Sequence, residues 1–208
     1  MDIQFYGANC IVLSNKLRRV VIDDNLKDLG AKSVTRNGDI SVFTGPHGDV
    51  GQEVRIVIDQ PGEFETQNVS AFGLQARSHI DEEGQKNAVI YRIIMSEVRV
   101  AIVGHIFPKL SESDLEALGS IDVLIVPVGG NGYTLDPEGA LEIIKAIEPK
   151  LVIPTHYADE TLNFPVPQQS LDDALKIIPI EVKERTVKLR IKPLDLTDST
   201  QLVVVEKS

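Results

Sequence analysis

With 208 residues, of which 42% are hydrophobic and 25% charged, the chain is expected to form one globular domain, residues 1–208, with a sizeable core. A formal net charge of −10, without a lysine or arginine cluster, disfavours a nucleic-acid partner. The single cysteine, Cys10, excludes an intrachain disulfide, and no apolar run approaches the ~18 residues that span a bilayer, which predicts a cytoplasmic protein without a membrane partner.

The first half of the chain is predicted to form short β-strands. Runs rich in β-branched residues alternate with glycine, proline, asparagine and aspartate, which favour turns. These runs are residues 3–6, 11–14, 19–23, 40–43, 55–58, 69–74, 88–95 and 98–103, the last two forming a hairpin. The segment around Glu63 and Glu65, after Pro61-Gly62, is expected to be a turn.

Helices are expected to alternate with strands from residue 111 onward. Two overlapping capping boxes, Ser111 with Asp114 and Ser113 with Glu116, predict a short helix that ends before Gly119. Further helices are predicted at residues 136–147 and 170–177, and strands at 121–128, 151–154, 186–192 and 201–205. This order of elements predicts two β-sheets packed face to face, with helices outside.

The chain contains only four histidines, and each ends a predicted strand or lies in the loop just after one. They are His47, His79, His105 and His156. In layered α/β proteins, strand ends and the loops after them build the functional site. Imidazole is also the commonest side-chain metal ligand. The placement of the histidines therefore predicts a metal site, or the remains of one.

Longer motifs point to one family. The most specific are IDVLIVPVGG at residues 121–130 with YTLDP at 133–137, and EPKLVIPTHY at 148–157. Weaker ones are FYGANC at 5–10, VID at 21–23 and PGEFE at 61–65. Over roughly residues 2–175 the chain resembles the metallo-β-lactamase superfamily, in particular its branch of metal-dependent hydrolases related to ascorbate lactonases. The resemblance implies an α/β fold, a four-layer αβ/βα sandwich of two mixed sheets, with water activated by one or two zinc-like ions at one edge.

The chain departs from this family at its main metal-binding signature. The family's His-x-His-x-Asp-His is here Gly45-Pro46-His47-Gly48-Asp49-Val50. Glycine and valine side chains cannot ligate a metal, so neither ion of a standard two-metal site would have its full ligand set. The resemblance also places His105 where the family has a bridging aspartate, and neutral imidazole in that position fits fewer cations.

Carried over position by position, the resemblance gives five candidate metal ligands, namely His47, Asp49, His79, His105 and His156. The alignment at His79 can slip by one residue onto Ser78. We expect one divalent ion, zinc with iron or manganese as alternatives, bound by His47, His105 and His156, with His79 or Asp49 completing the set. Asp49 and His105 are also the candidate catalytic residues, and Asp49 could orient the attacking hydroxide. The alternative is a former metal site that is now held by hydrogen bonds.

Four other residues have two interpretations each. Tyr157 could donate a hydrogen bond to an oxyanion or simply pack in the core. Arg77 could hold an anionic substrate or be an ordinary exposed arginine. Asp23 and Asp24 end a buried-looking strand, which favours a turn or a role in orienting metal ligands over direct catalysis.

Two functions remain open from the sequence. The first is a hydrolase acting on a small-molecule substrate, which could be a lactone, an ester or a phosphoester. The second is a non-catalytic relative that serves as a binding or assembly module, and the loss of ligands at Gly45 and Val50 favours it. A nuclease is disfavoured by the acidic charge. A homo-oligomer is supported by base rates alone.

Overall fold

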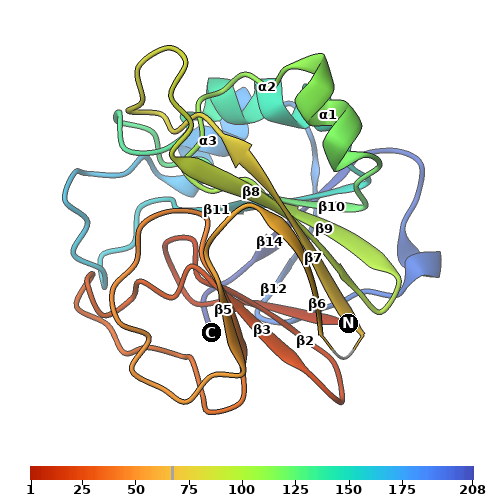
Figure 1. Ribbon diagram of the computed structural model, residues 1–208. Helices are drawn as coiled ribbons and strands as arrows, with labels where there is room; N and C mark the ends of the chain where they lie inside the picture. Colours follow the sequence, from red (N-terminus) through yellow and green to blue (C-terminus); the bar gives the residue numbers. More distant parts are fainter. Residues whose placement is uncertain (67) are drawn as a thin grey trace.

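Two mixed β-sheets pack face to face in the computed structural model, which describes residues 1–66 and 68–208 (Figure 1). The six-stranded sheet has the order β13 (Leu189–Arg190), β1 (Asp2–Phe5), β2 (Ile11–Ser14), β3 (Arg19–Ile22), β4 (Ile40–Val42) and β5 (Ile56–Ile58). The eight-stranded sheet has the order β12 (Val182–Thr186), β14 (Gln201–Val205), β11 (Leu151–Thr155), β10 (Val123–Pro127), β9 (Val98–Ile102), β8 (Ala88–Met95), β7 (Val69–Ala76) and β6 (Gly62–Thr66). This architecture confirms the predicted pair of mixed sheets.

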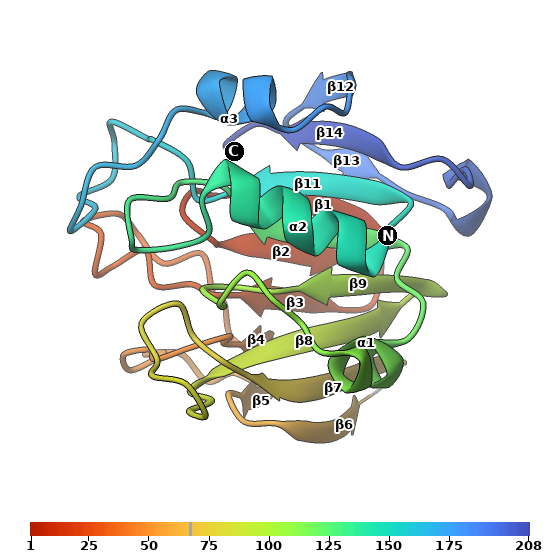
Figure 2. The same ribbon diagram turned by 90° about the horizontal axis from the view of Figure 1, so that it is seen from above.

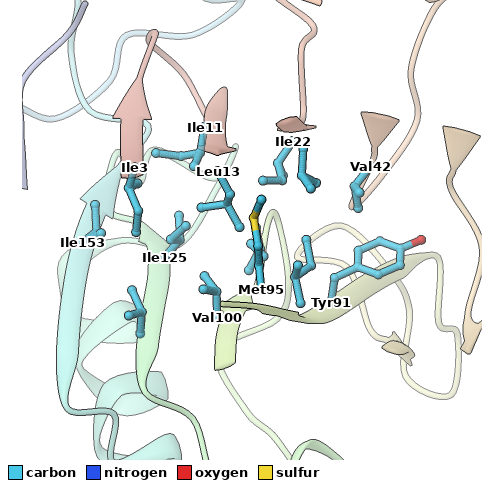
Figure 3. Close-up of a cluster of buried hydrophobic side chains, with 14 of the residues drawn as sticks. Ile3, Ile11, Leu13, Ile22, Val42, Tyr91, Met95, Val100, Ile125 and Ile153 are labelled. Carbon is cyan, nitrogen blue, oxygen red and sulfur yellow. The ribbon is translucent and has the colours of Figure 1, made fainter. Parts of the chain in front are cut away.

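The core between the sheets follows from the two-residue period of a strand. In β10, Val123 and Ile125 face the six-stranded sheet, whereas Leu124 and Val126 face the helices. All four side chains are buried, as the continuous apolar run predicts for a parallel strand covered on both faces. Figure 3 shows aliphatic side chains from both sheets, together with Met95 and Tyr91, meeting in the layer between them.

Three helices are described, and each begins at a side-chain cap. They are α1 (Glu112–Leu118), α2 (Pro137–Ile147) and α3 (Leu171–Ile177), capped by Ser111, Asp136 and Ser170. The capping box of α1 uses Ser111 with Asp114, which decides between the two overlapping boxes in the sequence. A short 3-10 helix, η1 (Pro193–Asp195), lies in the loop before β14. No helix in the described chain is long and apolar enough to cross a membrane.

All three helices cover the outer face of the eight-stranded sheet (Figure 2). The resemblance implied helices outside both sheets, but none of the described helices lies on the six-stranded side. Loops cover that face instead, and they bury Leu26, Leu29 and Leu162 against Val12 and Val21. The segment between β3 and β4 cannot form a long helix, because Gly30 and Gly38 adopt left-handed backbone angles and turns interrupt it.

Two strand predictions were wrong. The segment around Glu63 and Glu65 is not a turn but the edge strand β6, which pairs with β7 and leaves both glutamates exposed. Residues 186–192, predicted as one strand, divide between the sheets, because β12 ends at Thr186 and β13 joins β1 across the molecule. Long-range pairing with β7 and β1, which is not visible in the local pattern, decides both cases.

Candidate metal centre

Three of the four histidines meet at one edge of the eight-stranded sheet. His79, His105 and His156 follow β7, β9 and β11, which run in the same direction, so their carboxyl ends lie at the same edge. The ring centroids of His79 and His105 are 5.7 Å apart, and those of His105 and His156 are 4.7 Å apart. Tyr133, from the loop after β10, lies beside all three rings.

These residues line a cavity of about 320 Å³ at the end of the sandwich. The six-stranded sheet supplies Asp23, after β3, and Thr44, after β4. The full lining is Ala8, Asn9, Asp23, Asn25, Asp28, Leu29, Thr44, Gly45, Pro46, Ser78, His79, Ile80, Asn87, Ala88, His105, Tyr133 and His156. The cavity is therefore large enough for a small-molecule substrate and mixes polar with apolar walls.

The Nδ1 atom of each clustered histidine faces an oxygen acceptor. His79 Nδ1 donates to the carbonyl of His105 at 3.1 Å, and His105 Nδ1 donates to the carbonyl of Tyr133 at 2.9 Å. His156 Nδ1 donates to the side-chain oxygen of Gln168 at 3.1 Å. Because these oxygens only accept, each Nδ1 carries the hydrogen and each Nε2 keeps a free lone pair. This is the arrangement that fixes the tautomer of metal-binding histidines.

Burial keeps two of these rings neutral. Desolvation, together with the neighbouring histidines, lowers the pKa of His105 to about 3. Desolvation also lowers the pKa of His156 to about 4, against the hydrogen bond to Gln168, which acts in the opposite direction. Neither ring is protonated near neutral pH, so its Nε2 lone pair is available to a metal ion.

Asp23 is a buried carboxyl group at the same cavity. Its two oxygens accept hydrogen bonds from the backbone N–H and the hydroxyl of Thr44, both at 2.7 Å. Burial outweighs these bonds and raises the pKa of Asp23 to about 6. The sequence favoured a turn or an orienting role for Asp23 over catalysis. The raised pKa supports the catalytic alternative, because a carboxyl group with this pKa can exchange a proton near neutrality.

The backbone around the cavity is strained at three non-glycine residues. Ala8, Asp23 and His156 all line the cavity and have φ values of +48°, +49° and +52°. The N–H of His156 donates to the carbonyl of Ala8 at 2.8 Å, which ties this loop to the six-stranded sheet's first turn. Left-handed backbone at non-glycine residues is uncommon and concentrates at functional sites.

The remaining candidate ligands, His47 and Asp49, lie apart from this cluster. The ring of His47 stacks on Phe43 with centroids 3.8 Å apart, and its Nε2 lies 3.3 Å from the carboxylate of Asp59. Asp49 is exposed, accepts a hydrogen bond from the N–H of Gly51 at 3.1 Å, and lines a separate cavity of about 70 Å³. The structure thus brings His79, rather than His47 or Asp49, together with His105 and His156.

The other sequence candidates are also placed. Ser78 and His79 both line the cavity, but the imidazole of His79 is the group that joins the cluster. Tyr157 does not line the cavity and packs against Phe5, with ring centroids 5.5 Å apart. Asp24 accepts hydrogen bonds from Ser33, Val34 and Thr35 and so holds the loop after β3.

Tyr133 is the functional candidate that sequence reasoning missed. Its ring lies 5.0 Å from that of His105 and 5.4 Å from that of His156, and its hydroxyl has no hydrogen-bond partner among the described residues. The available signal was its position in the YTLDP motif, in the loop after a strand buried on both faces. That loop turns back over the cavity because Gly130 and Gly132 adopt left-handed angles.

The donor set suits a divalent metal ion. Two imidazoles that bind one zinc ion at about 2.1 Å have ring centres roughly 5 Å apart. The ring centres are 4.7 Å apart for His105 and His156, and 5.7 Å apart for His79 and His105. Across residues 1–66 and 68–208, however, no three His, Cys, Asp or Glu side chains already converge on one point as a ligand set. The chemistry of the nitrogens therefore fits the ion, and binding requires the rings to turn so that their Nε2 atoms converge on one point.

Known proteins share parts of this sequence and most of this fold. A UPF0173 metal-dependent hydrolase from Thermoplasma acidophilum is 47% identical over 47 residues, which are 21% of this chain and only 20% of the relative. A UPF0173 protein from Pyrococcus furiosus is 29% identical over 91 residues, 44% of this chain and 42% of the relative. The chain thus spans less than half the length of these curated relatives in the matched regions.

Among solved structures, a protein from Thermotoga maritima, described as a Zn-dependent hydrolase of the metallo-β-lactamase superfamily, matches with a TM-score of 0.75. It is 25% identical, and the match covers 98% of each chain. A metallo hydrolase from Ignicoccus hospitalis shares the fold at a TM-score of 0.59 and 17% identity, over 85% of this chain and 89% of its own. The family model of the beta-lactamase superfamily domain matches residues 2–156, so the chain belongs to this superfamily.

Proposed function

We propose that this protein is a metal-dependent hydrolase whose single divalent ion is held by the Nε2 atoms of His79, His105 and His156. The observation that carries the proposal is the shared hydrogen-bond pattern, in which each Nδ1 is held by an oxygen acceptor and each Nε2 is left free. The names of the Thermoplasma and Thermotoga proteins, a metal-dependent hydrolase and a Zn-dependent hydrolase, support it.

Zinc is the ion that this donor set favours. Three imidazoles resemble the ligand sets of catalytic zinc sites, which keep a fourth position open. Iron and manganese are the alternatives, although manganese prefers oxygen ligands. A divalent ion in this place would lower the pKa of a coordinated water and polarise the bond under attack.

Two other residues of the cavity would act on the substrate. The free hydroxyl of Tyr133 can donate a hydrogen bond to the oxygen that gains negative charge during acyl or phosphoryl transfer. Asp23, with a pKa raised to about 6, can take up a proton near neutral pH and return it to the leaving group. The expected substrate is a small lactone, ester or phosphoester, as the cavity of about 320 Å³ allows.

Metal content of matched variants tests this proposal. The protein is purified without chelator, reconstituted with zinc, desalted and analysed by elemental analysis beside His79→Ala, His105→Ala and His156→Ala. We expect about one equivalent of zinc in the wild type and a strong loss in each of the three variants. His47→Ala is the matched control and should retain the metal, because its ring points towards Asp59. Loss of zinc in the His47 variant alone would contradict the proposed ligand set.

A second candidate function is a metal-free binding module. The observation that favours it is the placement of His47 and Asp49, the two remnants of the family signature, outside the histidine cavity. Absence of bound zinc after reconstitution, with the wild type and all four variants equally stable, would support this candidate and exclude the hydrolase. The cavity would then be a site for ligand capture rather than catalysis.

A further inference from the structure

The charged side chains that line the histidine cavity are all negative. Among the described lining residues, the ones that carry a formal charge near neutral pH are the carboxylates of Asp23 and Asp28, and none is lysine or arginine. Anionic groups such as phosphates and carboxylates are usually held by arginine or lysine, because these side chains supply charge-assisted hydrogen bonds. The cavity wall supplies no such group.

The arginine nearest to His79 in sequence is engaged elsewhere. Arg77, the candidate for holding an anionic substrate, lies over the ring of Phe107 at 4.0 Å and donates two hydrogen bonds to the carbonyl of Asp81, at 3.1 and 2.9 Å. It lines a second cavity of about 290 Å³, together with Lys86 and Lys109, and is not among the residues that line the histidine cavity. Its guanidinium is thus already held by Phe107 and Asp81.

Asp28 places a negative charge where a substrate would enter. Its side chain is exposed and lines the cavity, and it makes no described side-chain hydrogen bond. Burial of the phenol is the larger cause of the raised pKa of Tyr133, and the negative charge of Asp28 is the second cause. The carboxylate of Asp28 therefore lies close enough to interact electrostatically with the Tyr133 hydroxyl. An anionic substrate group beside Tyr133 would be repelled by it.

Four other residues of the wall are apolar. They are Leu29, Pro46, Ile80 and Ala88, and Ile80 is 77% exposed although it directly follows His79. A large apolar side chain this exposed is one of few in the described chain, and here it stands at the rim of a cavity. It offers a contact surface to an apolar group that extends from the reacting centre.

We propose that the cavity selects a small uncharged ester or lactone whose apolar group packs against Ile80, and that it discriminates against phosphoesters and carboxylate-bearing substrates. This inference rests on the proposed function, since it names the substrate class of the same site. A bound divalent ion would bring two positive charges, and Asp23 and Asp28 bring two negative ones. The ion is therefore left without a surplus of positive charge to attract a substrate anion.

A pair of ligands that differ in one charged group tests the inference. The uncharged probe is the p-nitroanilide of pentanoic acid, and the anionic probe is the mono-p-nitroanilide of glutaric acid, in which a carboxylate replaces the terminal methyl group. Their dissociation constants are measured by calorimetry on zinc-reconstituted protein, and hydrolysis of the corresponding p-nitrophenyl esters is measured in parallel. We expect the uncharged probe to bind at least about tenfold more tightly than the anionic one.

Two substitutions assign the selectivity to the named residues. Asp28→Lys should bring the two dissociation constants within about threefold of each other, by improving binding of the anionic probe. Ile80→Ser should weaken binding of the uncharged probe by about threefold or more. Asp198→Lys makes the same charge change in an exposed loop outside the cavity lining and should leave the ratio as in the wild type.

The outcomes separate this inference from the proposed function. Equal or tighter binding of the anionic probe, or no binding of either probe, would overturn the inference. If the uncharged probe binds selectively but no ester is hydrolysed, the selectivity stands and the hydrolase proposal fails. If esters are hydrolysed and the anionic ester is preferred, the hydrolase stands and the selectivity fails.

Discussion

The imidazole rings of His105 and His156 form a T-shaped pair, in which the edge of one ring meets the face of the other; their centroids are 4.7 Å apart and their planes lie at 85°. This contact is held from both sides, because Nδ1 of His105 donates to the Tyr133 carbonyl and Nδ1 of His156 donates to Gln168. Burial disfavours a positive charge on either ring and is the main cause of both lowered pKa values; His156 and His79 lower the pKa of His105 further, and His79 lowers that of His156. The pair is therefore organised to offer lone pairs.

Removing the support of one ring should weaken metal binding without abolishing it. Gln168→Leu deletes the oxygen that accepts from His156 Nδ1 and leaves that ring free to change tautomer. We expect zinc affinity to fall by about 10–100-fold while the stoichiometry at saturation stays near one. Competition with a chromogenic chelator measures this. Gln169→Leu is the matched control, since no described side-chain hydrogen bond joins Gln169 to the cluster, and an equal loss in both variants would contradict the prediction.

Loss of the Tyr133 hydroxyl should affect turnover rather than metal content. In Tyr133→Phe the ring still packs beside His105 and His156, but the donor to a developing oxyanion is gone. We expect kcat for an ester substrate to fall by about 10²–10³-fold, with KM and zinc content nearly unchanged. Tyr157→Phe, which alters a tyrosine packed on Phe5, should retain kcat within about twofold. A kcat in Tyr133→Phe close to that of the wild type would exclude this role.

Ionisation of Asp23 should reduce stability as the pH rises. The pKa of Asp23 is about 6 in the folded protein, whereas the ordinary pKa of an aspartate is 3.8. The folded state therefore binds this proton more tightly than the unfolded chain does. This contribution is complete below pH 3.8 and is lost as the pH passes 6. About two pKa units correspond to roughly 3 kcal/mol.

Asp23→Asn keeps partners for Thr44 and removes the charge, so it isolates this effect. We expect the unfolding free energy of the metal-free wild type, relative to the variant, to fall by up to about 3 kcal/mol between pH 4 and pH 7. Urea unfolding at a series of pH values gives the difference directly. A difference that stays constant over this range would show that Asp23 does not titrate there.

A methyl group at Gly104 should destabilise the joint between the sheets. Gly104 has φ +57°, and a Cβ atom there would overlap the side chain of Thr44, which is itself bonded to Asp23. We expect Gly104→Ala to cost about 2–4 kcal/mol, from left-handed strain plus overpacking. Gly38→Ala is the control, because its φ of +81° is equally unfavourable but open space surrounds it, so about 1 kcal/mol is expected. Equal losses in both, by chemical denaturation, would contradict the overlap.

The strands that carry the site could be predicted from sequence because burial controls them locally. The run around Leu124 and Ile125 is apolar on both faces, and both faces are covered in the structure. Helix starts at Ser111, Asp136 and Ser170 were equally predictable, since a cap needs only a side chain and the N–H groups that follow it. These short-range rules place His105 and His156 at the correct strand ends.

Loop conformation could not be predicted in the same way. Local sequence shows that His47 follows β4, but it does not show that the ring stacks on Phe43 and turns towards Asp59. That choice depends on a partner twelve residues away in the chain and on the fold of the intervening loop. Likewise, the change of sheet between β12 and β13 depends on pairing with β1 at the opposite end of the sequence. Both are decided by tertiary contacts.

The three clustered histidines all belong to the eight-stranded sheet, whereas the loop after β4 in the other sheet supplies none of them. An ion held in this way would not depend on how the two sheets align with each other. The loop after β4 contributes to the cavity wall only through Thr44, Gly45 and Pro46. Substitutions in this loop would therefore reshape the cavity while leaving the three rings in place.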